Sequence, residues 1–442
     1  MSDPPDAATT RTATDRPDPP GAARSWLGSY GRVLRQPVLR RVLPGMLLSA
    51  LGDGMSMVAV AWLAVRIAPP GREGLWTGLA VAAYWLPATV GAAGLGRLVR
   101  GFSGARLVAA DATLRATALL AITVLAALGL LRPAGYVVLL AVSSLLHAWG
   151  SAGMYTLVAE QLPEEDRVTG NALLSTSARA TVVVGPALAG ALTAVVGPGW
   201  VLGLDAATFV VLAVSCWLTP TGPAAAGTTG DEADRSGGGW HAILARPRLL
   251  GLVVVTCLYF FLYGPVEVGL PIHVARELHG GPGLLGAFWT AFGVGAVAGG
   301  LATGLLRNYP LWTVVVLNIV GWGASLLPLG LTDAVVPGLV GFAVGGLIYG
   351  PYTAICTTLI QRVTPPHLRS RVLAIGTALT TPATALGTVI GGSVVGAVGG
   401  RRTILASALL TIVLGVVVAA VLGLHRIRFR VEPGGTPMRD GR

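Results

Sequence analysis

The sequence predicts an all-α membrane protein with twelve transmembrane helices in two pseudo-symmetric six-helix bundles. Of its 442 residues, 53% are hydrophobic and only 12% are charged, against roughly 25% charged residues in a soluble globular domain. Polar residues are confined to the tails and to short loops between long apolar runs, as a bilayer requires. One apolar run also occurs twice at a fixed spacing, which indicates a duplicated half.

The duplicated segment is an apolar run punctuated by glycine, and its two copies lie 202 residues apart, from position 185 to position 387. The loops directly upstream have the same spacing. The landmarks are Pro163, Arg167, Gly185, Gly190 and Gly197 in the first copy, and Pro365, Arg369, Gly387, Gly392 and Gly399 in the second. Many secondary transporters are built from such repeats, with the substrate site at the interface between the halves. The repeat therefore predicts a transporter with its site between two halves.

Each predicted span is an apolar run of about 20 residues, the length that a helix needs to cross a bilayer. The spans of the first half are predicted at 42–66, 75–96, 107–130, 134–157, 170–195 and 199–218. Those of the second half are predicted at 249–271, 283–305, 309–330, 334–357, 372–397 and 402–424. The two bundles are therefore expected over 42–218 and 249–424. A disordered N-terminal tail (1–41), a central linker (219–248) and a C-terminal tail (425–442) are all expected in the cytoplasm.

The distribution of arginine predicts the orientation, because cytoplasmic loops of membrane proteins are enriched in basic residues. With both termini in the cytoplasm, 23 of the 31 basic residues lie in inside segments and 6 lie outside. The other two, Arg115 and Arg179, fall within predicted spans. The net charge of +11 is thus a topology signal. We expect a multi-pass protein of the bacterial cytoplasmic membrane that binds no nucleic acid.

All 31 basic residues are arginine, and the absence of lysine excludes two kinds of chemistry. A Walker-type phosphate loop needs a lysine at the phosphates, and a Schiff-base enzyme needs a lysine amine. No zinc-protease motif, pair of catalytic carboxylates or Ser/His/Asp set converges in the spans. We therefore expect no enzyme, no metal site and no cofactor, with a proton gradient as the source of energy.

Four short motifs follow one another along the first half. They are Leu51-Gly52-Asp53-Gly54 in the first span, Asp111-Ala-Thr-Leu-Arg115-Ala116 opening the third, Asn171-Ala172-Leu173 before the fifth, and Gly185-Pro186-Ala-Leu-Ala-Gly190 within it. In this order, and with the twelve spans, they resemble the major facilitator superfamily over residues 42–425. More narrowly, the chain resembles the bacterial branch of drug, siderophore and macrolide exporters. The last motif is similar to the fifth-helix motif associated with antiporters.

Two departures from the family pattern concern gating and coupling. The loop between the second and third helices, from Gly96 to Arg106, carries Arg100 where the superfamily usually has an acid. Since that loop helps to latch the halves in one state, the resemblance implies altered gating chemistry. In addition, Leu146 stands where proton-coupled drug exporters have an arginine in the fourth helix. The standard proton relay therefore lacks one residue here.

Asp53 is the first candidate for proton coupling, because an ionisable residue in a spanning helix costs several kcal/mol unless it is paired or faces a cavity. It lies eleven residues after Val42, about 16 Å along the helix and near the middle of a roughly 30 Å apolar core. Ser49, Ser56 and Met57 share its face, and Met57 is a candidate substrate contact. The alternative is a structural acid that is hydrogen-bonded to neighbouring helices.

Glu267 is the second candidate, for proton coupling and for substrate binding. Phe260 and Tyr263 lie seven and four residues before it on one side of the predicted seventh helix, and both are candidate substrate contacts. Gly264-Pro265 interrupts this helix, and interrupted helices often line binding sites. An acid beside aromatic rings suits a cationic or amphipathic substrate. The alternative places Glu267 at the outer membrane interface, near Pro271.

Two further polar residues inside spans are candidate substrate contacts. Arg179 could pair with Asp53 or with an anionic substrate, and the preferred alternative is that it extends to the inner headgroup region. His147 shares a face of the fourth span with Ser143 and Ser144, and histidine could shuttle protons near neutral pH. A structural histidine satisfied among serines is the interpretation that we prefer.

The remaining candidates concern gating and helix packing. Asp111 and Arg115 are four residues apart, a spacing that predicts a local ion pair on a helix. Asp205 is expected at the outer interface, at the end of the sixth span. Small residues and proline allow close and deformable helix contacts. The gating and structural set is Gly96, Arg100, Asp111, Arg115, Gly185, Pro186, Gly190 and Pro382.

The function that we predict is secondary-active efflux of a small amphipathic molecule, such as a drug, an antibiotic or a siderophore-like compound, by proton antiport with alternating access. The expected partners are the lipid bilayer and the small-molecule substrate, and the protein is expected to be a monomer. A proton-coupled nutrient importer is the alternative, although the spans are poor in Asn and Gln and richer in aromatic residues and Met, which favours apolar cargo. A lipid scramblase or a non-transporting membrane sensor is a third class.

Overall fold

The computed structural model describes residues 30–96, 98–99, 101–220, 238–306, 308–365 and 368–431. Within these residues the chain is almost entirely helical and contains no strand. Eleven helical segments of the described chain are long and apolar enough to cross a membrane. Most of the predicted N-terminal tail, most of the central linker and the end of the C-terminal tail lie outside the described residues.

Within the described part of the first half, the helices α2 to α8 together cover its six predicted spans. They are α2 (Pro37–Ile67), α3 (Glu73–Gly94), α4 (Gly104–Ala127), α5 (Pro133–Ser144), α6 (His147–Gln161), α7 (Glu164–Val196) and α8 (Pro198–Trp217). Prolines occupy the first turns of α2, α5 and α8, where the missing N–H has no intrahelical partner to lose.

The second half is built in the same way. Its elements are α9 (Gly238–Leu244), α10 (Pro247–Ile272), the π-helix η1 (His273–Glu277), α11 (Pro282–Ala302), the 3₁₀-helix η2 (Thr303–Leu306), α12 (Leu311–Ser325), α13 (Leu327–Leu331), α14 (Val335–Tyr349), α15 (Tyr352–Val363), α16 (Arg369–Val398) and α17 (Gly400–Val431). The helix α17 therefore extends past residue 424, where the last span was predicted to end.

The fifth predicted span, 170–195, lies in the 33-residue helix α7. Among the described residues of this helix, Val183–Val196 forms an apolar segment. The first turn of α7, before the predicted span, carries Glu164, Glu165 and Asp166, which favour a helix N-terminus.

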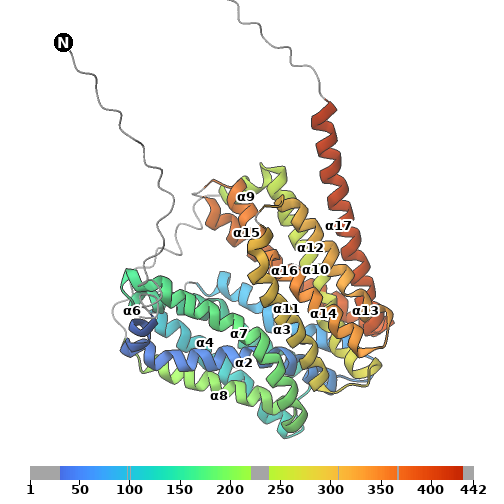
Figure 1. Ribbon diagram of the computed structural model, residues 1–442. Coiled ribbons are helices and arrows are strands. Elements are labelled where there is room, and N and C mark those ends of the chain that lie inside the picture. The colour runs from blue at the N-terminus through green and yellow to red at the C-terminus, as the bar shows by residue number, and fades with distance from the viewer. Residues whose placement is uncertain are drawn as a thin grey trace, which may run out of the picture.

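The helices pack in two sets that follow the two halves of the sequence (Figure 1). In the first set α2 packs on α7 and α8, and α4 packs on α6 and α8. In the second set α10 packs on α16 and α17, and α11 packs on α14. The sets meet mainly where α3 packs on α16 and where α7 packs on α11. Helices α6 and α15, at the other ends of the two sets, lie far apart in Figure 1.

The duplicated glycines explain this arrangement, because each copy contacts both sets. A side chain at Gly185 would meet Gly54 of α2, with a Cβ 2.5 Å from its Cα, and one at Gly387 would meet Phe261 of α10. Gly185 and Gly387 thus each pack on the first helix of their own half. Gly190 and Gly392 instead face the other half, where Gly190 packs on Gly286. In the same way Gly392 packs on Gly74, whose carbonyl oxygen lies 2.4 Å from the position of a Cβ.

The ends of the repeated helices also match. Gly197 ends α7 with φ +85° and Gly399 ends α16 with φ +89°, a backbone conformation that glycine adopts without steric cost. At the other end, Arg167 Nε donates to the carbonyl oxygen of Leu162 at 3.2 Å. Arg369 Nε donates to the oxygen of Thr364 at the same distance. The repeat in the sequence is therefore also a repeat in three dimensions.

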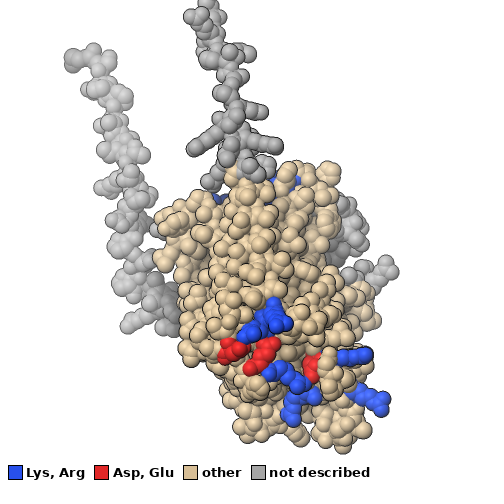
Figure 2. Space-filling model, turned by 90° about the vertical axis from the view of Figure 1, so that its right-hand side faces the viewer, with Lys and Arg blue, Asp and Glu red and all other residues tan. Residues whose placement is uncertain are grey.

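The outer surface of the helices is largely uncharged. The face in Figure 2 is almost free of charged side chains except for one region, where acidic and basic residues lie together. Large apolar side chains are exposed along the outer helices, among them Leu409, Leu410 and Val413 of α17. Such a surface suits contact with lipid.

Candidate functional site

The motif around Asp53 is a meeting point of three helices. Gly52 makes room for Asp205 of α8, since a Cβ at Gly52 would fall 2.0 Å from the Asp205 Oδ1. Gly54 makes room for α7, since its Cβ would fall 2.5 Å from the Thr181 carbonyl oxygen. Both glycines are needed for close approach, and together they place Asp53 of α2 inside the first set of helices.

Asp53 forms an ion pair with Arg115 of α4. Arg115 Nη2 lies 2.5 Å from Asp53 Oδ1, and Nη1 lies 3.3 Å from Oδ2. The Tyr84 hydroxyl donates to Asp53 Oδ1 at 2.9 Å and accepts from Arg115 Nη2 at 2.8 Å. The guanidinium also stacks on the ring of Phe209, 4.5 Å from its centroid. The side chain of Arg115 is only 3% exposed, against 35% for Asp53, so the pair is buried on the arginine side and open on the acid side.

The predicted local ion pair between Asp111 and Arg115 is wrong. Arg115 points to α2 instead, where Asp53 offers it two carboxylate oxygens, and no ion pair with Asp111 forms in the described structure. Asp111 faces α6, with its Oδ2 3.9 Å from His147 Nδ1 and against Gly150, where a Cβ would fall 2.2 Å away. Its other oxygen, Oδ1, is buried with no hydrogen-bond partner.

His147, the first residue of α6, contacts Arg115 of the charged pair and not Ser143 or Ser144 at the end of α5. Its Nδ1 lies 2.9 Å from Arg115 Nη1. Ser143 and Ser144 donate to the backbone oxygens of Leu140 and Ala83 instead. The preferred interpretation of a histidine satisfied among serines is therefore wrong in its partners, because serine hydroxyls in a helix readily bond to carbonyl groups of nearby turns.

Asp205 was expected at the outer interface, but the structure buries it fully among the helices, with 0% exposure. The Ser56 hydroxyl contacts its Oδ2, and Thr208 Oγ1 lies 3.3 Å from Oδ1. The expectation failed because it considered only the distance of Asp205 from the end of its span. Gly52 in the motif around Asp53 could have indicated this burial, because a glycine on α2 leaves space for a side chain of a neighbouring helix.

Glu267 lies where the two sets of helices meet. It borders a small cavity of about 20 Å³, room for roughly one water molecule. Thr388 of α16 donates to Glu267 Oε2 at 3.5 Å, which places the acid between α10 and α16. The cavity is lined by Met57, Val60, Ala61, Val81, Tyr84, Trp85, Glu267 and Trp289. Because Tyr84 also bonds to Asp53, it links the charged pair to this cavity.

Phe260 and Tyr263 belong to an aromatic cluster in the second set. The Tyr263 ring lies 5.8 Å from Trp322 and 6.0 Å from Tyr349, between centroids. Phe260 packs edge-on against Tyr349 at 6.4 Å. The cluster consists of Tyr259, Phe260, Tyr263, Phe288, Trp289, Phe292, Trp322, Phe342, Tyr349 and Tyr352. The sequence pattern found Phe260 and Tyr263 on α10, but not their partners on α11, α12, α14 and α15, because those are distant in the chain.

The other predicted residues lie at helix contacts or outside the part of the chain that the structure describes. Pro186 and Gly190 lie where α7 packs on α11, and Pro382 lies inside α16. Gly96 packs near the ring of Trp149, with a Cβ position 3.3 Å away. Arg100 and the side chain of Arg179 lie outside the described part of the structure.

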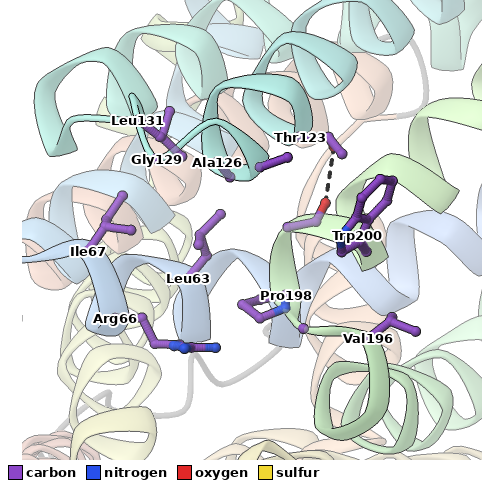
Figure 3. Close-up of a pocket in the computed structure, with 13 residues that line it drawn as sticks. Leu63, Arg66, Ile67, Thr123, Ala126, Gly129, Leu131, Val196, Pro198 and Trp200 are labelled. Carbon is purple, nitrogen blue, oxygen red and sulfur yellow. Dashed lines mark hydrogen bonds between the residues drawn. The ribbon is translucent and has the colours of Figure 1, made fainter.

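A second and larger cavity opens at the ends of α2, α4 and α7 and the start of α8 (Figure 3). Its volume is about 430 Å³, and among its lining residues only Arg66 is charged. Thr123 donates to the Gly199 carbonyl oxygen across one wall at 3.0 Å. Trp200, at the opening, is 59% exposed. Within the described residues no group of three or more acidic, His or Cys side chains could hold a metal ion.

Comparison with known proteins identifies the class. Residues 30–432 match the family model described as transmembrane secretion effector, and the chain belongs to this family of the major facilitator superfamily, as its motifs predicted. It is a multi-pass membrane transporter of that superfamily, and both the family and the relatives point to a transporter and not to an enzyme.

Among its relatives, the chain is 31% identical over 386 residues to the multidrug efflux pump Tap of Mycobacterium tuberculosis, a match that covers 81% of this chain and 87% of Tap. It is 29% identical over 262 residues to the uncharacterized MFS-type transporter y4rN of Sinorhizobium fredii, covering 57% of this chain but only 63% of y4rN. The crystal structure of a D-xylose-proton symporter superposes with a TM-score of 0.65 at 12% identity, over 87% of this chain and 97% of that one. This last likeness shows the fold alone.

Proposed function

We propose that the protein exports a small amphipathic molecule from the cytoplasm by proton antiport. In this proposal twelve helices form two six-helix bundles that alternate between inward and outward access, and the protein acts as a monomer in the bacterial cytoplasmic membrane with both termini in the cytoplasm. One observation carries the proposal. A buried arginine is paired with the carboxylate of Asp53, which connects through Tyr84 to a cavity between the two halves.

This geometry can couple a proton to a change of conformation. A proton on Asp53 neutralises the carboxylate and weakens its bond to Arg115, which then needs another acceptor, because an unpaired buried charge is costly. Tyr84 moves with the pair, since it bonds to both members, and Tyr84 lines the cavity that Glu267 also borders. Proton and substrate bias the two states only if each binds them with different affinity.

The cavity holds about one water molecule in this conformation, and its lining suits an amphipathic, cationic cargo once the two halves move apart. Trp85, Trp289 and Met57 offer polarizable apolar surface around the single carboxyl of Glu267. Aromatic faces attract cations, and methionine adapts to irregular ligands. The relation to Tap, which is named as a multidrug efflux pump, supports export of such molecules.

The test is the accumulation of ethidium and a panel of antibiotics in a host that lacks its own pumps. We expect cells with the wild-type protein to accumulate less dye than cells with Asp53→Asn, and the difference to vanish with a protonophore. Asp333→Asn is the matched control, since Asp333 is an exposed acid paired with Arg401 at 2.7 Å. Normal efflux by Asp53→Asn would remove Asp53 from the coupling. Greater accumulation in cells that express the wild type would indicate an importer instead.

A further inference from the structure

Asp205 is an intramembrane acid that the proposed export mechanism does not use. We propose that Asp205 is a second proton-binding residue of the transport cycle, which receives protons from the cavity of Figure 3 and passes them to the Asp53–Arg115 pair. The inference rests on the proposed proton antiport, and it adds the residue and the route on the outer side.

The surroundings of Asp205 accommodate the carboxyl group in both of its protonation states. Its two polar neighbours are the hydroxyls of Ser56 and Thr208. A hydroxyl can donate to a carboxylate and can accept from a carboxylic acid, so neither form leaves Asp205 unsatisfied. A site designed only to hold a fixed anion would present N–H groups or an arginine.

Among the side chains that the structure describes, no cation bonds directly to Asp205. On α4 the nearest cation is Arg115, which interacts with Asp205 electrostatically but bonds directly to Asp53 of α2. Asp111, also on α4, adds a second acid. Residues 181–196 of α7, which also packs on α8, contain no charged side chain. A buried carboxylate without a counter-ion is costly, so Asp205 holds its proton in this conformation.

The large cavity approaches Asp205 from the outer end of the first half. Gly199 lines the cavity and is six residues before Asp205 on α8, about 9 Å along the helix. On α2, Leu63 lines the cavity and is seven residues after Ser56, about 10 Å away. The cavity is large enough for several water molecules. Of the buried acids in the cluster, Asp205 is thus placed nearest to this space along the helices.

The proposed transfer balances protons and charges. In this conformation Asp205 already holds the proton, which it has taken from water in the cavity. When Asp205 gives this proton to Asp53, directly or through the Ser56 hydroxyl, Arg115 exchanges its partner from the Asp53 carboxylate to the Asp205 carboxylate. One proton enters, one proton moves on, and the guanidinium faces one carboxylate before and after the exchange. Phe209, one turn from Asp205 on α8, supports the guanidinium from below.

Infrared difference spectroscopy of the purified protein tests the protonation directly. We expect the wild type to show the C=O stretch of a protonated carboxyl that shifts in D₂O, and Asp205→Asn to have lost this component. Asp333→Asn, which removes an exposed acid, is the control and should retain it. An Asp205→Asn spectrum with the full wild-type band would overturn the proposal.

Ser56→Ala tests the proposal if Asp205→Asn does not fold. This variant retains Asp205 but removes one of its two hydroxyl partners, so the C=O band of Asp205 should shift in frequency. An unshifted band would count against the proposal. These spectra require no transport. If Asp205→Asn loses the band but the wild type expels no dye, the export function is wrong and the protonation of Asp205 stands. If the wild type shows normal proton-driven efflux but the band is unchanged in Asp205→Asn, the role of Asp205 is wrong and the export function stands.

Discussion

The two halves of the molecule share a packing scheme but differ in what fills their centres. Gly54 packs on Gly185 in the first half, and Gly264 packs on Gly387 in the second, so the residues before them, Asp53 and Tyr263, hold matching places. Asp53 pairs with Arg115 on α4, while Tyr263 packs on Trp322 of α12. An ion pair in one half thus corresponds to an aromatic pair in the other.

The match extends to the acid on α8. Asp205 packs against Gly52, and the residue 202 positions later, Ser407, donates to the carbonyl oxygen of Leu262 on α10. Backbone contacts have therefore been kept, while ionisable side chains are concentrated in the first half and aromatic ones in the second. From this difference we infer that the proposed roles are divided between the halves, with proton binding in the first and recognition of the apolar part of the cargo in the second.

The largest expected effect is at the ion pair. Asp53→Leu removes the carboxylate that Arg115 bonds in this conformation, and we expect a loss of at most about 3–5 kcal/mol in the free energy of unfolding, the range for buried pairs broken on one side. Replacing both residues with leucine should cost much less than the sum of the single changes. Chemical denaturation of the four proteins of this double-mutant cycle measures the difference, and additive effects would contradict a coupled pair.

The next effect concerns the contact between halves. Gly392→Ala places a Cβ 2.4 Å from the Gly74 carbonyl oxygen, and such overpacking typically costs about 1–3 kcal/mol. Gly376→Ala is the control on the same helix, because no atom lies within 4 Å of its Cβ position. Thermal unfolding of both variants should separate them. Equal melting temperatures would mean that α3 and α16 are not in close contact in the most stable state.

A smaller effect is expected at the aromatic pair that corresponds to the ion pair. The cycle of Tyr263→Leu and Trp322→Leu should give a coupling of about 0.5–1.5 kcal/mol, the range for aromatic pairs. We expect dye efflux to weaken through substrate affinity, with the dependence on the proton gradient retained. Loss of the proton dependence in Tyr263→Leu would break the proposed division between the halves.

The smallest effect is expected at the ion pair that joins the halves near the surface, between Glu73 of α3 and Arg276 of η1. The Arg276 side chain is 61% exposed, and exposed pairs contribute about 0.2–1 kcal/mol. Glu73→Gln should therefore lower stability slightly in dilute buffer and not at all in high salt, where such charges are screened. A large loss that persists in salt would identify this pair as a main link between the halves.

Much of the architecture was predictable from local sequence. Apolar runs of span length gave helices at the predicted places, and the 202-residue spacing recurs in the matching helix ends at Gly197 and Gly399. Within the site, the sequence singled out Asp53 and Glu267 as intramembrane acids, but it paired Arg115 with Asp111 and placed Asp205 at the surface.

The sequence alone predicts which segments are apolar enough to enter the membrane, that the chain is duplicated, and which ionisable residues lie within apolar helices. The apolar segments follow from the cost of exposing polar groups to lipid, which acts on each segment separately. The partners of the ionisable residues become visible only in the folded arrangement. Arg115 reaches Asp53, 62 positions away, and Asp205 fits against Gly52, because buried charges select the best acceptor in space and not the nearest one in the chain.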